Sequence, residues 1–288
     1  PPPPPPPPHT PPPPPEHHTN AESSAASDVY KRQDFAVLNA ITKALAFLEL
    51  QREEVALITG IGCSSRIAAY TSVYGFHGVH GRALALAAGL RVARPDLTVL
   101  VAGGDGDGLS IGGNHFIHAC RRNMNLTYVL MDNEVYGMTK GQASPTTAPD
   151  WMDSKLTPQG TGIRPFQPAG LALTAGASFI ARGFTGDPNG LARILVEAVQ
   201  HPGFSFVQAL SPCPTFRPEQ MQWKRHVRGF EEEATDDPIE AAGRIQADDG
   251  MSSGIIFRRE YPVFQPGKPG GAVRAQTCME QIEQELRV

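Results

Sequence analysis

The sequence predicts an α/β fold in which a mostly parallel sheet carries helices on both faces. Short apolar runs alternate with longer segments whose apolar residues recur at helical spacing. Glycine-rich turns follow two of the apolar runs. Strands that alternate with helices are joined by right-handed crossovers, and the resulting parallel sheet is buried on both faces.

The first predicted helix begins at Asp34, a residue type that often caps helices. The apolar residues after it recur at helical spacing: Phe35, Leu38, Ile41, Leu45 and Leu48. Residues 55–59 then form an apolar run typical of a buried strand, which ends in a Gly-Ile-Gly turn.

Strands and helices continue to alternate as far as residue 214. The predicted strands are residues 97–102, 126–131, 179–182 and 204–210, and the predicted helices are residues 80–93, 112–122, 169–175 and 188–200. Residues 138–168 are rich in Gly, Pro, Thr and Ser, so we expect a long loop there, and such loops are often functional.

The two ends of the chain differ from this middle part. Thirteen of the first fifteen residues are proline, so residues 1–33 are predicted to be disordered or a polyproline rod. The run SAASDVYKRQ resembles translated adapter sequence, which favours a foreign segment over a proline-rich ligand for a recognition module. Residues 34–214 are predicted to form one α/β domain, and residues 215–288 an irregular C-terminal extension with short helices.

Composition excludes several classes of protein. The 288 residues carry a formal net charge of -4, which provides no basic footprint for nucleic acid. No apolar run approaches the roughly 20 residues of a membrane-spanning helix, and there is no signal-peptide core. We therefore expect a cytoplasmic protein without nucleic-acid or membrane partners.

The glycine-rich segment GGDGDG, residues 103–108, carries the informative chemistry. Asp105 lies in a turn between a predicted strand and a helix whose N-terminal amides can face an anion. Asn133 follows 28 residues later, at the end of the next strand. Adjacent parallel strands bring both loops to the carboxyl edge of the sheet, where ligands bind in open α/β sheets. A carboxylate, an amide oxygen and a backbone carbonyl suit Mg²⁺, which also takes oxygens from phosphates and water.

Other ligand-binding loops fail on spacing. An EF-hand needs a glutamate at loop position twelve, and counting from Asp105 that position is Phe116. A P-loop needs Gly-Lys-Ser/Thr, which is absent. A dinucleotide-binding G-x-G-x-x-G counted from Gly104 fails at Leu109. The segment therefore predicts a site for a magnesium-bound diphosphate.

The order GDG and then Asn about 28 residues later resembles the thiamine-diphosphate-binding motif. Within it, GDGDGLSIGGNHFIHACRRN and DNEVYGMTKGQASPTT resemble the beta subunits of 2-oxoacid:ferredoxin oxidoreductases. The runs ITGIGCSSR, HGVHGRALALAAGL and LSPCPTF are similar to the same family. The resemblance covers roughly residues 34–265, and it makes residues 34–214 the thiamine-diphosphate-binding domain.

The resemblance also implies roles for individual residues. Mg²⁺ would be bound by Asp105, by the Asn133 side chain and by the backbone carbonyl of Val135. Arg66 would lie near the substrate carboxylate and His80 near the cofactor. These two residues are the candidate catalytic residues. The other residues implied to contact the cofactor or to shape the substrate pocket are Gly62, Cys63, His80, Gly81, Gly104, Gly106, Asp107, Tyr136, Gly137 and Met138.

The family passes electrons to ferredoxin through a [4Fe-4S] cluster, which four cysteine thiolates hold. Cys63 and Cys213 match two of these ligands. The expected C-x-x-C would fall near Val29 and Arg32 and is absent, so the chain as written has an incomplete ligand set. We interpret this as a truncated N-terminus joined to foreign sequence. The alternative is a natural homologue that has lost its cluster.

The expected function is that of a beta subunit in CoA-dependent oxidative decarboxylation of a 2-oxoacid to an acyl-CoA, with ferredoxin reduction. By the same resemblance, an alpha subunit supplies the glutamate that activates the cofactor. GIGCSSR and HGRAL favour 2-oxoglutarate over pyruvate or branched-chain acids. A non-oxidative thiamine-diphosphate enzyme and a binding subunit with an inactive cofactor site are the alternatives.

Overall fold

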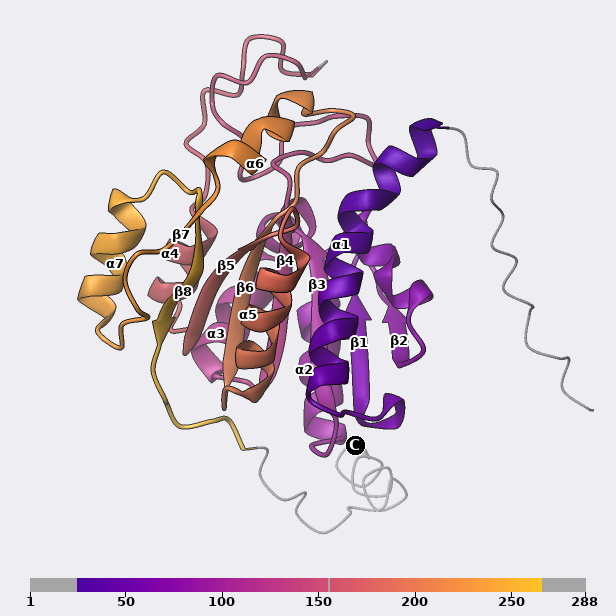
Figure 1. The fold of residues 1–288 in the computed structure, drawn as a ribbon, viewed down its shortest axis with the longest axis vertical. Coiled ribbons are helices and arrows are strands. Elements are labelled where there is room, and N and C mark those ends of the chain that lie inside the picture. The colour runs from indigo at the N-terminus through magenta and orange to yellow at the C-terminus, as the bar shows by residue number, and fades with distance from the viewer. Residues whose placement is uncertain (1–24, 155, 266–288) are drawn as a thin grey trace, which may run out of the picture.

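An eight-stranded sheet in the order β2-β1-β3-β4-β6-β5-β8-β7 runs through the computed structural model, which describes residues 25–154 and 156–265 (Figure 1). Strands β1 to β6 are mutually parallel, whereas β8 is antiparallel to β5. The strands are β1 (Val55–Thr59), β2 (Tyr74–His77), β3 (Thr98–Gly104), β4 (Leu126–Asp132), β5 (Phe179–Phe184), β6 (Phe204–Leu210), β7 (Arg228–Gly229) and β8 (Ser252–Arg258).

Helices connect the strands and cover both faces of the sheet. The α-helices are α1 (Ala25–Phe47), α2 (Ala83–Ala93), α3 (Gly113–Arg122), α4 (Pro168–Thr174), α5 (Pro188–Gln200), α6 (Trp223–His226) and α7 (Pro238–Ala247). Shorter helical turns are η1 (Arg52–Glu54), η2 (Ser64–Tyr70), η3 (Asp107–Ile111) and η4 (Pro218–Gln222). None of the helices in the described residues is long and apolar enough to cross a bilayer.

The core lies on both faces because alternate residues of a buried strand point to opposite sides. Helices α1 and α5 lie side by side over one face, where Leu57 and Val129 are buried (Figure 1). Helices α2, α3 and α4 cover the other face, where the rings of Phe116 and Phe206 pack 5.1 Å apart. The predicted α/β fold with a mostly parallel sheet is confirmed.

The first helix differs from the sequence prediction. Helix α1 begins at Ala25, so Asp34 lies within the helix and does not cap it. Residues 25–33, placed in the disordered segment by composition, are helical backbone that continues into the apolar stripe after Asp34. The proline-rich residues 1–24 lie outside the described part of the chain.

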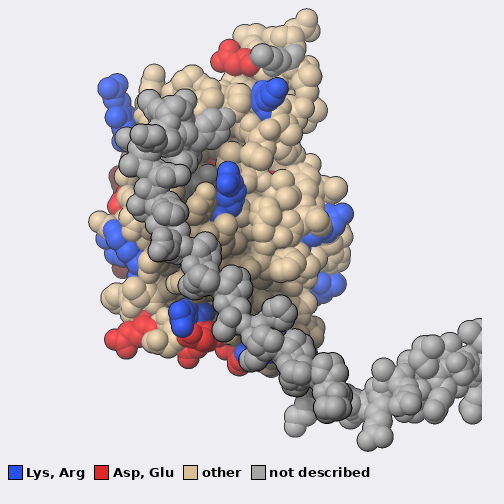
Figure 2. All heavy atoms as spheres, turned by 90° about the vertical axis from the view of Figure 1, so that its right-hand side faces the viewer, with Lys and Arg blue, Asp and Glu red and all other residues tan. Residues whose placement is uncertain are grey.

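Strand β2 was missed by the sequence prediction because it lies at the edge of the sheet and its side chains are exposed. Tyr74 and Phe76 are 56% and 52% exposed, so the strand has no buried apolar run to reveal it. Figure 2 shows the face on this side of the molecule, where charged side chains are scattered over a largely uncharged surface.

The C-terminal extension holds more regular structure than its composition indicated. Strand β8 pairs with β5, and its Phe257 is fully buried in the core that α4 and α7 cover. Residues 252–258 are therefore part of the main sheet, although they lie beyond residue 214.

Candidate active site

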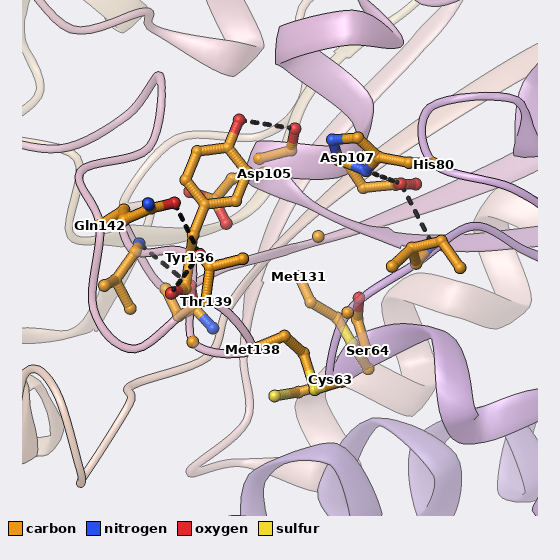
Figure 3. A pocket seen from close by; sticks show the side chains of 17 residues that line it. Cys63, Ser64, His80, Asp105, Asp107, Met131, Tyr136, Met138, Thr139 and Gln142 are labelled. Carbon is orange, nitrogen blue, oxygen red and sulfur yellow. Dashed lines mark hydrogen bonds and ion pairs between the residues drawn. The ribbon is translucent and has the colours of Figure 1, made fainter.

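A cavity of about 330 Å³ opens at the carboxyl edge of the sheet, beyond the ends of β1, β3 and β4 (Figure 3). Each of these strands is followed by a loop that reaches the cavity, as the sequence predicted for adjacent parallel strands. The lining residues are Ile61, Gly62, Cys63, Ser64, His80, Gly104, Asp105, Gly106, Asp107, Met131, Asn133, Val135, Tyr136, Gly137, Met138, Thr139 and Gln142.

The predicted site residues converge on this cavity with three exceptions. Gly81 lies behind the lining, and Arg66 is exposed on η2 and does not line the cavity. Cys213 is buried beneath the neighbouring loop. The predicted residues that do line it are Gly62, Cys63, His80, Gly104, Asp105, Gly106, Asp107, Asn133, Val135, Tyr136, Gly137 and Met138.

Asp105 and Asn133 reach the cavity from the ends of β3 and β4, which are adjacent and parallel. Asp105 is only 2% exposed, and its Oδ2 accepts hydrogen bonds from the hydroxyls of Ser144 and Thr146, the latter at 2.8 Å. The Asn133 Oδ1 accepts from the backbone N–H of Val135 at 3.2 Å. The two oxygen-bearing side chains are therefore held in place by loop contacts.

A second buried carboxylate lies next to Asp105. The Thr146 hydroxyl is 2.8 Å from Oδ1 of Asp132, while Oδ2 of Asp132 accepts from Nε2 of Gln208 at 2.8 Å. Burial, and then the charge of Asp132, raise the pKa of Asp105 to about 7. Burial also raises the pKa of Asp132. A hard cation at this position would stabilise both carboxylates in their charged form.

Asp107 joins the two loops that follow β1 and β2. Its Oδ1 accepts from the backbone N–H of Gly81 at 2.7 Å, from that of Ile61 at 3.1 Å, and from Nδ1 of His80 at 2.8 Å. Figure 3 shows Asp107 beside His80 on one side of the cavity and Cys63 beside Met138 on another. Oδ1 of Asp107 therefore already has three protein donors, while Asp107 also lines the cavity, where the family resemblance implies contact with the cofactor.

Gly106 is required by the close approach of Tyr136. A Cβ atom at Gly106 would lie 2.2 Å from Cε1 of Tyr136, whose hydroxyl donates to the Gly106 carbonyl at 3.1 Å. The Tyr136 ring also meets the His80 ring edge-on, with centroids 6.4 Å apart. Tyr136 therefore packs directly on the glycine-rich turn.

Sequence reasoning missed five lining residues. The loop after Tyr136 closes on itself, since the N–H of Tyr136 donates to the Gln142 carbonyl at 2.8 Å and the Thr139 hydroxyl donates to Oε1 of Gln142 at 2.7 Å. Both residues belong to the segment GMTKGQ, which contains the predicted Met138, and this closeness in sequence is the signal that could have identified them. The full set of missed lining residues is Ile61, Ser64, Met131, Thr139 and Gln142.

The two candidate cluster cysteines are linked through contacts of Gly137 and Phe216. A Cβ atom at Gly137 would lie 3.5 Å from Sγ of Cys63 and 3.9 Å from the ring of Phe216. Phe216 in turn packs against the cluster that contains Cys213. Within the described residues, no group of three or more His, Cys, Asp or Glu side chains is placed to hold a metal. These thiols therefore do not form a complete cluster site in the described chain.

Comparisons with known proteins identify the family of this chain. The family described as thiamine pyrophosphate enzyme, C-terminal TPP binding domain, matches residues 60–209. A 2-oxoacid:ferredoxin oxidoreductase subunit beta from Saccharolobus solfataricus is 38% identical over 232 residues, which cover 79% of this chain and 75% of that protein. The chain belongs to the family of 2-oxoacid:ferredoxin oxidoreductase beta subunits.

Other beta subunits of the family show higher identity over a shorter region. The 2-oxoglutarate oxidoreductase subunit KorB of Mycobacterium tuberculosis is 51% identical over 183 residues, covering 64% of this chain and 49% of that protein. The 2-oxoglutarate synthase subunit KorB of Archaeoglobus fulgidus is 49% identical over 165 residues, covering 57% of this chain and 61% of that protein. The chain thus matches only about half to three fifths of the length of these relatives.

A solved structure agrees with the assignment to the 2-oxoacid:ferredoxin oxidoreductases. The 2-oxoglutarate:ferredoxin oxidoreductase from Magnetococcus marinus, with 2-oxoglutarate, coenzyme A and succinyl-CoA bound, superposes with a TM-score of 0.78 at 38% identity. The match covers 88% of this chain and 84% of that one. The predicted family is confirmed.

Proposed function

We propose that this beta subunit binds thiamine diphosphate through Mg²⁺ and takes part in CoA-dependent oxidative decarboxylation of a 2-oxoacid, with electrons passing to ferredoxin. The observation that supports it most strongly is the meeting of Asp105 and Asn133 at one cavity on the carboxyl edge of the sheet. Both side chains offer hard oxygen ligands of the kind Mg²⁺ prefers.

The residues at the cavity fit the magnesium and diphosphate group. Asp105, Asn133 and the backbone carbonyl of Val135 would hold the metal, and the backbone of Gly104 and Gly106, which lines the cavity, would lie along the diphosphate. When bound, thiamine diphosphate supplies the carbanion chemistry of decarboxylation, while the protein provides orientation and electrostatics.

His80 and Arg66 have different supporting observations. The hydrogen bond from Nδ1 of His80 to Asp107 leaves Nε2 of a neutral imidazole as an acceptor for a bound group. His80 lines the cavity, so this acceptor would serve the cofactor or the substrate. Arg66 lies on η2, three residues after Cys63 and outside the cavity lining. Its proposed role, binding the substrate carboxylate by charge-assisted hydrogen bonds, rests on the family resemblance.

The proposed substrate is 2-oxoglutarate. The Mycobacterium tuberculosis and Archaeoglobus fulgidus relatives are named for it, and the Magnetococcus marinus structure has it bound. Met138 is 64% exposed at the cavity and would shape the substrate pocket. Pyruvate and branched-chain acids are the alternatives, and a panel of 2-oxoacids assayed with the alpha and beta subunits together would separate them.

The proposed electron path involves two cysteines of this chain. Cys63 and Cys213 would provide two of the four thiolates of a [4Fe-4S] cluster. The positions expected for the other pair, Val29 and Arg32, are not cysteines and lie in α1. The chain as written lacks two of the four cysteine ligands, so its residues do not fit a complete cluster. An alpha subunit and ferredoxin are the proposed protein partners.

The magnesium site is tested by replacing its carboxylate. Asp105→Ala is expected to weaken Mg²⁺-dependent binding of thiamine diphosphate by at least about 100-fold, because a direct metal ligand is lost. Isothermal titration calorimetry with and without Mg²⁺ measures this affinity. Asp150→Ala, which alters an exposed aspartate in the long loop, is the matched control and should bind as the wild type does. An unchanged affinity in Asp105→Ala would contradict the proposed site.

A further inference from the structure

The side chain of Gln220 bridges two functional segments that lie far apart in the sequence. Gln220 is 1% exposed, in η4. Its Nε2 donates to the backbone carbonyl of Asn133 at 3.0 Å, and its Oε1 accepts from the backbone N–H of Cys213 at 3.0 Å. Because one partner is an acceptor and the other a donor, only this orientation of the amide satisfies both.

Arg217 makes a second bridge between the same segments. Its guanidinium donates to the carbonyl of Glu134 at 3.0 Å and forms an ion pair with the Glu134 carboxylate at 3.0 Å. The guanidinium also lies over the ring of Trp151, 4.7 Å from its centroid. Trp151 packs in the small cluster that contains Cys213 and Val135. Arg217 is only 6% exposed, so these contacts are screened from water.

The two bridged segments differ in how they hold their shape. In the Cys213 segment (residues 213–220), the N–H of Arg217 donates to the Cys213 carbonyl at 2.8 Å and that of Gln220 to the Arg217 carbonyl at 3.0 Å. Successive turns therefore shape this segment. In the Asn133 loop (residues 133–135), Glu134 has a φ of 55°, which is uncommon for a non-glycine residue. Such a conformation persists where surrounding contacts impose it.

We propose that Gln220 and Arg217 are positioning residues that clamp the Asn133 loop to the Cys213 segment, so that ordering one segment orders the other. This inference rests on the proposed function, in which the Asn133 loop holds Mg²⁺. Coupling between two sites is reciprocal, so binding of magnesium and thiamine diphosphate also restrains Cys213.

Two substitutions at Gln220 separate the two ends of the clamp. Gln220→Met keeps a similar side-chain length and removes all three side-chain hydrogen bonds, including the one from Nε2 to Oε2 of Glu134 at 3.3 Å. Gln220→Glu keeps an acceptor for the N–H of Cys213 and loses the donor to the Asn133 carbonyl and to the Glu134 carboxylate. Gln222→Glu makes the same chemical change at an exposed position of η4 and is the matched control.

The first measurement is the affinity of the full chain, in complex with its alpha subunit, for thiamine diphosphate with Mg²⁺, by calorimetry. Gln220→Met and Gln220→Glu are each expected to weaken it by at least about tenfold, as the loss of a contact that orients a metal-binding loop does. Gln222→Glu is expected to keep the wild-type affinity. The second measurement is the alkylation rate of Cys213 by N-ethylmaleimide, followed on its own peptide by mass spectrometry.

Alkylation reports the Cys213 end of the clamp directly. Without cofactor, Gln220→Met should react about tenfold faster than the wild type, because a lost buried hydrogen bond eases local opening. Gln220→Glu should react at nearly the wild-type rate. Saturating magnesium and thiamine diphosphate should slow the reaction in the wild type and leave the rate in Gln220→Met unchanged.

Gln220→Met with wild-type affinity and wild-type Cys213 reactivity would overturn the clamp. Circular dichroism melts verify that each variant is folded. Where Gln220→Met does not fold, Arg217→Lys, which keeps the charge and loses the planar fork, is expected to shift both readouts in the same direction. A wild-type chain that does not bind the cofactor even together with its alpha subunit contradicts the proposed function instead, and the cofactor-free alkylation rates of the two Gln220 variants still decide the clamp.

Discussion

At the scale of single residues, the GDGDG segment shows that two aspartates two positions apart have different tasks. Asp105 lies at the end of β3 with its oxygens among hydroxyls of the long loop. Asp107 begins η3 and accepts two backbone N–H groups from other loops. A buried carboxylate needs hydrogen-bond donors. Which donors lie within reach depends on the loops that the fold places beside it. The sequence identified Asp105 as a ligand candidate, while the task of Asp107 needed the structure.

Asp107→Ala is expected to lower the free energy of unfolding by about 1–3 kcal/mol, because the amides of Ile61 and Gly81 lose their buried acceptor. Urea denaturation followed by circular dichroism measures this loss. Asp96→Ala serves as control, since Asp96 is 60% exposed and forms a surface ion pair with Arg94, and its midpoint should stay at the wild-type value. Equal midpoints for the two variants would show that Asp107 does not join the loops.

At the scale of elements, the amino edge of the sheet is tied together by a polar cluster opposite the candidate active site. His201 ends α5 and is 6% exposed, with Nε2 2.9 Å from the Ser178 hydroxyl. Ser178 donates to Oδ1 of Asn123 at 2.7 Å, and Nδ2 of Asn123 donates to the Tyr261 carbonyl at 3.1 Å. Asn123 is also the left-handed C-cap of α3. The ends of three elements and the C-terminal segment are thus joined here.

This cluster predicts an acid-sensitive component of stability. Burial, and then the charge of Arg258, lower the pKa of His201 from 6.5 to about 4. Between these values the unfolded chain binds a proton that the folded chain does not, so stability falls as the pH falls through this window. Above 6.5 the contribution is fully present. His201→Gln should therefore lose stability less steeply than the wild type over this range.

Urea unfolding of the wild type and His201→Gln at several pH values from 7.5 down to about 4 measures the two slopes. The exposed His226 offers the control substitution His226→Gln, which should follow the wild-type profile. Parallel pH profiles for the wild type and His201→Gln would rule out this role for His201.

At the scale of the whole molecule, the C-terminal segment completes the sheet and connects to the candidate site. Arg182 on β5 donates to Oε1 of Gln208 at 3.1 Å and to the Ser252 carbonyl at 3.1 Å, and it pairs with the buried Asp248. Gln208 in turn donates to Asp132 beside the cavity. A buried network therefore runs across neighbouring strands from the site to β8, and we expect β8 to unfold together with the rest of the sheet.

Phe257→Ala is expected to destabilise the entire described domain by about 3–5 kcal/mol, because a fully buried ring of β8 is removed from the core. The free energy of urea unfolding should fall within a single transition. Phe264→Ala, at a position that is 40% exposed, is the matched control and should have a much smaller effect. A separate early transition in Phe257→Ala would mean that the C-terminal segment folds on its own.

Most strands and helices between residues 34 and 214, and the carboxyl-edge position of Asp105 and Asn133, could be read from the sequence, because they depend on periodicity and on spacing between near neighbours in the chain. The family could be read from its sequence motifs. The tertiary structure alone decided that Arg66 is exposed, that Asp107 binds backbone amides, that β8 joins β5, and that Gln220 reaches Asn133. Each of these depends on contacts between residues far apart in sequence, and such contacts exist only once the sheet and its loops have packed together.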